Sequence, residues 1–211
     1  MHEVNNSKLK TQNSKLPGGI GVVVLAAGRG SRMGATPKLL LPLQDGRPII
    51  RHAVSNALSW NPSEVIVVVR PDLPAILEAL ADLPLTCVPN PRYEVGMATS
   101  LAVGISALSN RIEAALVALG DEPYVAKHIV MRLVAAYTSE RKPITIPQYG
   151  EQVGPPTLFA RSIFPELLTL DGDIGGRQLL SRYPDLVCLV PLNKEDRPRD
   201  VDTPEDYRAL L

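Results

Sequence analysis

Short runs of aliphatic and β-branched residues alternate along this chain with longer stretches in which apolar residues recur at helical spacing. This alternation is typical of a mostly parallel sheet, because each parallel strand needs a crossover, usually a helix, before the next can pair with it. The expected strands are residues 21–27, 64–69, 85–89, 114–119 and 185–190, and the expected helices are 48–59, 73–81, 97–108 and 126–137. The sequence therefore predicts a three-layer, Rossmann-like α/β fold with helices on both faces of the sheet.

The pattern changes after Ser139. Residues 143–147 and 156–160 flank a glycine-containing turn and predict two strands with a hairpin-like connection. Two helices are expected after them, near 163–168 and 175–182. A last short helix begins after Thr203, because a threonine N-cap, a proline in the first turn and an acid three residues after the cap mark a helix start.

The length and composition fit one folded domain. The chain has 211 residues, 45% of them apolar, which is enough to bury a substantial core. Residues 1–18 are polar, lack the apolar segment of a signal peptide and are expected to form a disordered tail, which leaves 19–211 as a single domain. Because no apolar run reaches the roughly 18 residues of a membrane span, we expect a cytoplasmic protein.

The charge balance argues against two classes of partner. Lysine plus arginine and aspartate plus glutamate both count 22, so no global field would draw the protein to nucleic acid or to an anionic membrane. Cys87 and Cys188 each lie in an apolar stretch and are interpreted as buried, reduced thiols. His52 and His128 lie in expected helices without partners at zinc spacing, and we expect them on helix faces.

The segment from Val22 to Leu43, VVVLAAGRGSRMGATPKLLLPL, joins an expected strand to a glycine-rich, basic loop. The spacing of Gly28, Gly30 and Gly34 fits neither a dinucleotide-binding turn nor a Walker A loop. Glycines let backbone N–H groups approach an anion, and Arg32 and Lys38 add positive charge. A triphosphate matches this loop at the carboxyl end of a strand; the alternative is a solvated turn with chance basic residues.

Carboxylates follow two strand ends. Asp121 and Glu122 come after residues 114–119, and Asp202 lies where the last strand gives way to the last helix. Mg²⁺ prefers one or two carboxylates together with phosphate oxygens, so Asp121 and Asp202 are the candidate metal ligands. Helix capping is the structural alternative for Asp202, although Thr203 can cap the helix instead.

Five segments in this order resemble the MobA-like nucleotidyltransferases, most closely the molybdenum cofactor cytidylyltransferases of the MocA type: LAAGRGSRMGATPKLLLPL, NPRYEVGMATSL, ALVALGDEPYV, DGDIGGRQLL and DVDTPEDY. The resemblance spans about Gly21 to Leu211. It implies a fold of the nucleotide-diphospho-sugar transferase type and an Mg²⁺-dependent transfer of CMP from CTP to the terminal phosphate of a molybdopterin or molybdenum cofactor, with release of pyrophosphate. A molybdenum hydroxylase apoenzyme is a possible further partner.

The resemblance also assigns roles by matching motif. Nucleotide contacts fall to Leu25, Ala26, Ala27, Gly28, Gly30, Arg32, Lys38, Thr99 and Ser100. Lys38, Arg32 and Asp121 are the expected catalytic residues, and Asp121 and Asp202 the expected metal ligands. The LAAG segment is similar to the cytidylyl members, where guanylyl members have LAGG, and this favours CTP.

Two departures limit the resemblance. Glu122 replaces a glutamine that the family often has and adds a negative charge beside the proposed metal, which it either binds or points away from. Gly154-Pro155-Pro156 replaces a common Gly-His-Pro turn near the acceptor, and the missing histidine leaves the acceptor open. A sugar phosphate or another phosphorylated metabolite is therefore an alternative acceptor. Arg177 is either an acceptor-phosphate ligand or a surface arginine. A non-catalytic nucleotide-binding partner of a molybdenum enzyme is the alternative from another functional class.

Overall fold

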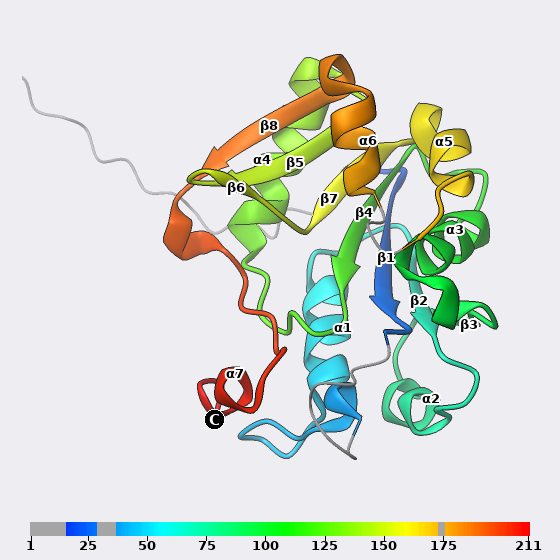
Figure 1. The fold of residues 1–211 in the computed structure, drawn as a ribbon, viewed down its shortest axis with the longest axis vertical. Helices are drawn as coiled ribbons and strands as arrows, with labels where there is room; N and C mark the ends of the chain where they lie inside the picture. Colours follow the sequence, from blue (N-terminus) through cyan, green and yellow to red (C-terminus); the bar gives the residue numbers. More distant parts are fainter. Residues whose placement is uncertain (1–15, 29–36, 173–175) are drawn as a thin grey trace, which may run out of the picture.

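A computed structural model of the chain describes residues 16–28, 37–172 and 176–211. Within these ranges an eight-stranded mixed sheet runs in the order β3-β2-β1-β4-β7-β5-β6, and β8 pairs with β5 (Figure 1). The strands are β1 (Ile20–Ala26), β2 (Val65–Val69), β3 (Thr86–Pro89), β4 (Ala114–Leu119), β5 (Ile144–Tyr149), β6 (Gln152–Val153), β7 (Thr157–Ala160) and β8 (Val187–Leu192). Strands β3, β2, β1 and β4 are parallel, as are β5 and β8, whereas β7 runs antiparallel between β4 and β5. The mostly parallel sheet and the hairpin-like β5–β6–β7 region are thus confirmed.

Helices cover both faces of the sheet, as the sequence predicts (Figure 1). The α-helices are α1 (Ile49–Ser59), α2 (Ala75–Leu80), α3 (Met97–Ala107), α4 (Lys127–Glu140), α5 (Phe164–Leu168), α6 (Arg177–Arg182) and α7 (Pro204–Arg208). The 3-10 helices are η2 (Lys38–Leu40), η3 (Tyr93–Val95), η4 (Arg161–Ile163), η5 (Pro184–Leu186) and η6 (Lys194–Asp196). One core cluster joins the sheet to α1 and α4, and the other joins it to α3, α5 and α6.

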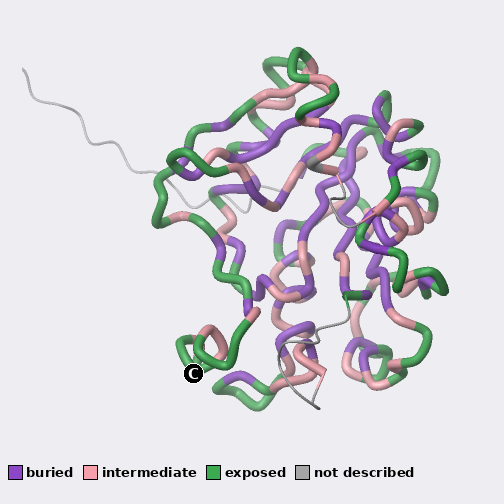
Figure 2. Tube along the Cα trace, in the orientation of Figure 1, coloured by how far each residue is buried: buried purple, intermediate pink, exposed green. Residues whose placement is uncertain are grey.

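The central strands are buried on both faces (Figure 2). In β1, Val22 and Val24 pack into the cluster with α1 and α4, and Val23 packs into the cluster with α3. This explains why the strand reads as a continuous apolar run instead of an alternating one. Leu16, within the segment expected to be a tail, is also buried in the first cluster, and residues 1–15 lie outside the described ranges.

The two cysteines correct one expectation. Cys87 and Cys188 are free thiols, but both are only partly buried. Among the described strands, β3 pairs only with β2 and β8 only with β5, so the sheet shields these residues less than those of the central strands. Partial burial raises the pKa of both thiols, which disfavours the thiolate.

Helix α3 lies close against β1 and β2 because Gly104 has no side chain. A Cβ there would come within 2.4 Å of Val23 Cγ1 and 3.0 Å of Val68 Cγ2. We expect Gly104→Ala to lower the free energy of unfolding by about 1–3 kcal/mol, since overpacking outweighs the gain in helix propensity. Urea denaturation measures this, with Ser106→Ala on the exposed side of α3 as the control. A Gly104→Ala protein as stable as the wild type would contradict the close packing.

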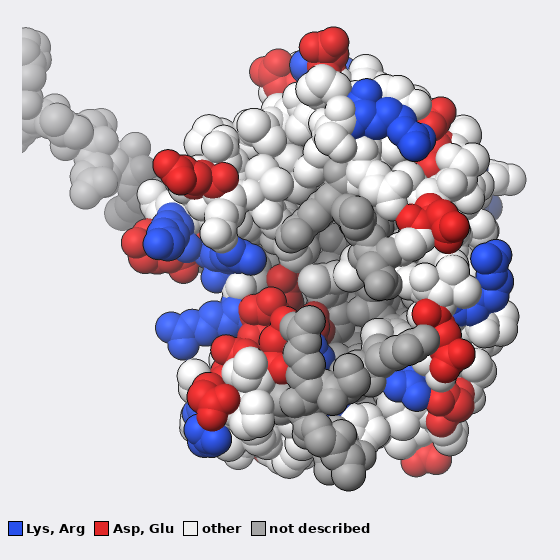
Figure 3. Space-filling model, viewed as in Figure 1, with Lys and Arg blue, Asp and Glu red and all other residues white. Residues whose placement is uncertain are grey.

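None of the helices in the described ranges is both long enough and apolar enough to cross a bilayer. Both acidic and basic side chains lie on the described part of the face drawn in Figure 3, and several acidic ones gather left of and below its centre.

Candidate active site

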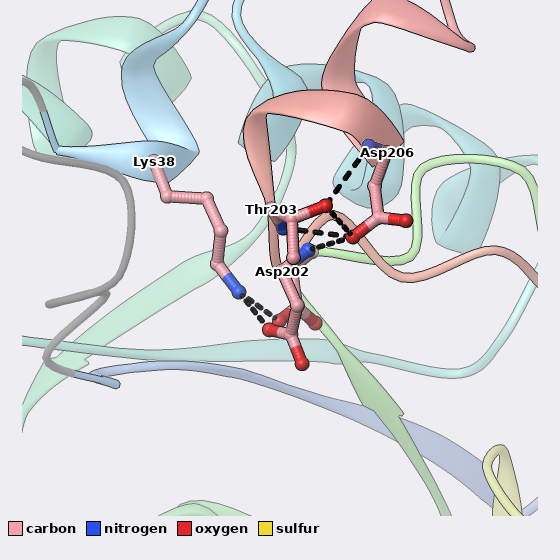
Figure 4. A network of polar contacts seen from close by, with 5 residues as sticks. Lys38, Asp202, Thr203 and Asp206 are labelled. Carbon is pink, nitrogen blue, oxygen red and sulfur yellow. Dashed lines mark hydrogen bonds and ion pairs between the residues drawn. The ribbon is translucent and has the colours of Figure 1, made fainter.

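Three segments that are far apart in the sequence bring a lysine and two aspartates together. Lys38 begins η2, Asp121 lies two residues after β4, and Asp202 lies two residues before α7. Lys38 Nζ donates to Asp121 Oδ2 at 2.6 Å and to Asp202 Oδ1 at 2.9 Å (Figure 4). The ammonium group therefore lies between the two carboxylates predicted as metal ligands.

This cluster is partly shielded from water. The side chain of Lys38 is 11% exposed, that of Asp121 21% and that of Asp202 41%. Burial alone would lower the pKa of the Lys38 ammonium group, but the charges and hydrogen bonds of the two carboxylates outweigh it and raise this pKa above its ordinary value. Lys38 is consequently a fixed positive charge at neutral pH.

Backbone contacts hold the C-terminal segment in place beside β4. Val201 N donates to the Asp121 carbonyl oxygen at 3.2 Å, and the Val201 side chain is fully buried. The hydroxyl of Tyr207 in α7 donates to the Pro42 carbonyl oxygen, which links α7 to the segment that follows Lys38. The three charged residues are therefore positioned by packed and hydrogen-bonded backbone.

Capping of α7 does not use the Asp202 carboxylate. Thr203 Oγ1 accepts from Asp206 N at 3.1 Å, and Asp206 Oδ2 accepts from Thr203 N at 2.7 Å, which forms a reciprocal capping box (Figure 4). Asp206 Oδ2 also accepts from the backbone N–H of Asp202 at 3.2 Å. The Asp202 carboxylate points instead to Lys38, so the alternative in which Asp202 is the cap is excluded.

The two carboxylates fit a divalent cation. They already converge on one cationic group, the Lys38 ammonium, and carboxylate oxygens are the ligands that Mg²⁺ and Mn²⁺ prefer. No cluster of three or more His, Cys, Asp or Glu that could hold a metal occurs in the described ranges. A metal at this point would therefore need further ligands from water or from a phosphorylated substrate.

The described part of the glycine loop begins beside Asp121. Residues Leu25 and Leu119 are register partners in the parallel pair β1–β4, and Gly120 N donates to the Leu25 carbonyl oxygen at 2.9 Å. Ala26 and Ala27 are buried and Gly28 is exposed. The predicted contacts Gly30 and Arg32 lie outside the described residues. The described part of the loop thus starts at the same sheet edge as the carboxylates, where open α/β sheets bind ligands.

Thr99 and Ser100, predicted beside the nucleotide, belong to a separate hydrogen-bond network. Asn90 Nδ2 donates to Thr99 Oγ1 and to Ser100 Oγ, both at 2.9 Å, and Asn90 is almost fully buried. Thr99 Oγ1 also lies 3.0 Å from the carbonyl oxygen of Arg92 and 2.9 Å from that of Gly96. These contacts fix the loop between β3 and α3 to the start of the helix. Asn90 was missed by the sequence interpretation, and its only signal was an Asn-Pro pair after a strand.

Glu122 follows Asp121 directly in the sequence but differs from it in exposure. It is buried, with 6% exposure, and its charge acts on Tyr149 of β5. Burial is the main cause that raises the pKa of the Tyr149 hydroxyl, and the negative charges of Glu122 and Asp196 add to it. That hydroxyl donates to the Pro155 carbonyl oxygen at 3.0 Å. The neutral phenol therefore anchors the Gly154-Pro155 turn.

A cavity of about 400 Å³ lies on the α3 and α6 side of the sheet. It starts from Leu25 and Leu119 at the ends of β1 and β4 and extends to Pro155 and to Leu180 of α6. Its lining in the described residues is largely apolar, and Thr157 contributes the one side-chain hydroxyl there. The cavity therefore continues from the sheet edge into the part of the chain after Ser139. The side chain of Arg177, predicted near the acceptor, is outside what the structure describes.

Two carboxylates that converge on one cationic group thus lie where the described part of the glycine loop begins, at the carboxyl edge of the sheet, which is where open α/β sheets bind ligands. The family described as MobA-like NTP transferase domain matches residues 22–187. The chain belongs to this family of nucleotidyltransferases, and the resemblance noted in the sequence is confirmed.

Similar proteins cover nearly the whole chain. The nicotine blue oxidoreductase of Paenarthrobacter nicotinovorans is 32% identical over 200 residues, which are 90% of this chain and 95% of that protein. The crystal structure of Rv0371c from Mycobacterium tuberculosis H37Rv is 33% identical with a TM-score of 0.79, over 92% of this chain and 98% of that one. A nucleotidyl transferase from Methanothermobacter thermautotroptrophicus is 27% identical with a TM-score of 0.75, over 90% and 94%. Rv0371c has also been solved in complex with manganese.

Proposed function

We propose that this protein transfers CMP from CTP to the terminal phosphate of a molybdopterin-type acceptor and releases pyrophosphate. The observation that carries the proposal is the convergence of Lys38, Asp121 and Asp202 at the sheet edge where the glycine loop begins. Membership of an NTP transferase family supports a nucleoside triphosphate as the first substrate. In this reaction a phosphate oxygen of the acceptor forms a bond to the α-phosphorus while the bond to pyrophosphate breaks.

The residues of the chain contribute binding and charge to this reaction. Asp121 and Asp202 would hold Mg²⁺, which supplies Lewis-acid stabilisation of the charge on the phosphates when it is bound. Lys38 would neutralise phosphate charge as the transition state forms. The backbone from Ala27 onward would bring N–H groups to the triphosphate. Catalysis then rests on proximity and electrostatics, without a covalent intermediate on the protein. The manganese complex of Rv0371c supports a divalent metal in a related protein.

The choice of CTP rests on the Ala26-Ala27 pair. This pair belongs to the LAAG segment that resembles the cytidylyl members, and both side chains are buried, Ala26 in the cluster with α1 and α4 and Ala27 in the cluster with α3. The choice of acceptor draws support from the cavity. The described lining is largely apolar, so the hydroxyl groups of a sugar would lose their hydrogen bonds to water there without gaining new ones. A flat ring can instead pack its two faces against the apolar side chains. The cavity thus supports an acceptor with a flat ring over a sugar phosphate.

Filling the cavity should affect the acceptor alone. We expect Leu180→Trp to raise KM for the acceptor about tenfold or more, at an unchanged KM for CTP, since a lost fit in an apolar pocket is worth about 1–3 kcal/mol. Steady-state kinetics with each substrate varied in turn measures this. The control is Leu189→Trp on the exposed side of β8. If KM for CTP rises and KM for the acceptor stays constant, the cavity is not the acceptor site.

Two other functions are alternatives to the proposed one. The name of the Paenarthrobacter relative makes an oxidoreductase a second candidate, because that protein matches along 90% of this chain. A non-catalytic nucleotide-binding partner of a molybdenum enzyme is the other. The paired carboxylates around Lys38 favour transfer chemistry over the oxidoreductase, since a redox reaction needs no cation there. The presence of Lys38, Asp121 and Asp202 together argues against a partner that has lost catalysis.

One assay compares these functions. Pyrophosphate release is followed with CTP, GTP, ATP or UTP, Mg²⁺ and either molybdenum cofactor or a sugar phosphate. We expect release with CTP and molybdenum cofactor. Release only with a sugar phosphate would change the acceptor, and tight CTP binding without turnover would indicate the non-catalytic partner. Reduction of nicotine blue by NADH or NADPH that survives Asp121→Asn would support the oxidoreductase.

A further inference from the structure

The ammonium group of Lys38 occupies the position between the two proposed metal ligands. Its Nζ is 2.6 Å from Asp121 Oδ2 and 2.9 Å from Asp202 Oδ1, so the oxygens that would bind a metal already bind a cation (Figure 4). In the sequence Lys38 is 83 positions from Asp121 and 164 positions from Asp202, so the fold, and not the local sequence, sets these contacts. In the ligand-free protein the lysine is the counter-ion of the carboxylate pair.

Lys38 cannot keep these contacts when a metal binds. A divalent cation on the same oxygens would place two like charges within a few ångströms of each other in a partly shielded site, where their repulsion is weakly screened. The side chain can leave without a change in the backbone, because a lysine has a flexible four-carbon stem. The neighbouring Leu39 is buried in the core and holds the backbone of η2 in place. Movement is thus confined to the side chain.

A triphosphate offers Lys38 the partner that it loses. Phosphate oxygens can accept from the displaced ammonium, and they also complete a metal shell for which the described protein residues supply two carboxylates. Metal binding therefore frees the Lys38 ammonium for the triphosphate, and the triphosphate both takes Lys38 away from the carboxylates and supplies oxygen ligands to the metal. By linkage, the factor by which one raises the affinity of the other is reciprocal.

We propose that Lys38 holds the cation position until metal and triphosphate bind together, and that it then exchanges the carboxylates for the phosphates. This inference rests on the proposed function for the location of the metal and the triphosphate. It assigns Lys38 a positioning role before chemistry, which makes the binding of metal and nucleotide strongly coupled. The ligand-free protein accordingly binds divalent metal only weakly on its own.

Binding of Mn²⁺ tests the exchange without any turnover. Free Mn²⁺ is measured by its EPR signal, with and without a CTP analogue that carries a methylene group between the α- and β-phosphates. For the wild type we expect the analogue to tighten Mn²⁺ binding about tenfold or more, within the usual range of coupling between sites. For Lys38→Met we expect Mn²⁺ to bind about tenfold more tightly than to the wild type in the absence of the analogue, with a smaller further effect of the analogue.

The control and a second variant keep the test decisive. Lys142→Met alters a lysine whose Nζ donates to the Asp185 carbonyl oxygen, and it should leave Mn²⁺ binding unchanged. Lys38→Gln repeats the measurement with a polar neutral side chain, and thermal melting confirms that each variant is folded. Unchanged or weaker Mn²⁺ binding in both Lys38 variants would overturn the proposal, as would wild-type binding that ignores the analogue. Failure of the proposed function is a separate result, namely coupled binding without pyrophosphate release for any acceptor.

Discussion

Asp121→Asn is expected to lower kcat for nucleotidyl transfer by about 10³-fold. The substitution keeps the size of the side chain but removes the negative charge that the metal needs, and loss of several kcal/mol of metal stabilisation corresponds to a factor of this size. Lys38 would also lose the carboxylate that it contacts at 2.6 Å. Pyrophosphate release at saturating CTP, acceptor and Mg²⁺ measures the effect.

The fold should survive this change. Asp121 is partly exposed, and its backbone carbonyl, which accepts from Val201 N, is unaffected by the substitution. We therefore expect a far-UV circular dichroism spectrum like that of the wild type. Asp185→Asn, at an exposed carboxylate in η5, is the matched control and should keep full activity. An Asp121→Asn protein with a near-normal rate would contradict the assignment of Asp121 as a metal ligand.

Lys38→Met is expected to lower kcat/KM for CTP by about 10²- to 10³-fold. The variant keeps most of the length of the side chain but no longer neutralises phosphate charge, and loss of one pre-positioned charge or donor typically has this effect. Lys38→Arg should recover only part of the rate, because a planar guanidinium does not reproduce the compact charge of an ammonium that is 11% exposed. Initial rates at subsaturating CTP measure both variants.

Lys142→Met again serves as the lysine control, here for activity. Equal kcat/KM in Lys38→Met and in the wild type would contradict a role of Lys38 at the phosphates. A loss confined to KM for the acceptor would instead locate Lys38 beside the second substrate.

Much of the fold could be predicted from periodicity. The apolar run of β1 and the helical spacing in α1 and α4 predict elements whose side chains are buried by layers on both sides, and these elements form as expected. Strand pairing was harder to predict, because the residues of β7 do not indicate that this strand inserts antiparallel between β4 and β5. That arrangement depends on contacts between segments far apart in the chain.

The candidate site could be predicted as a set of residues but not as a network. Asp121 follows β4 at the carboxyl edge of the sheet, as the sequence predicts, whereas Asp202 lies beyond β8 and η6, just before α7. The salt bridges with Lys38 depend on side-chain direction and on the anchoring of α7 through Val201, which sequence does not encode locally. The sequence also did not indicate that the side chain of Glu122 is buried.

Two misjudged features have the same physical origin. Asn90 resembles an ordinary turn residue, but its amide is satisfied by hydroxyls nine and ten residues further on, in another element. Cys87 and Cys188 lie in apolar runs, but each of their strands pairs with only one other described strand. In each case the environment is made by residues distant in sequence.

A crystal structure with Mn²⁺ and the methylene analogue of CTP tests the central claim most directly. We expect an anomalous manganese peak between the carboxylates of Asp121 and Asp202, phosphate oxygens completing the metal shell, and Lys38 Nζ on the phosphates. A manganese peak elsewhere, or a bound triphosphate with Lys38 still between the two carboxylates, would contradict it.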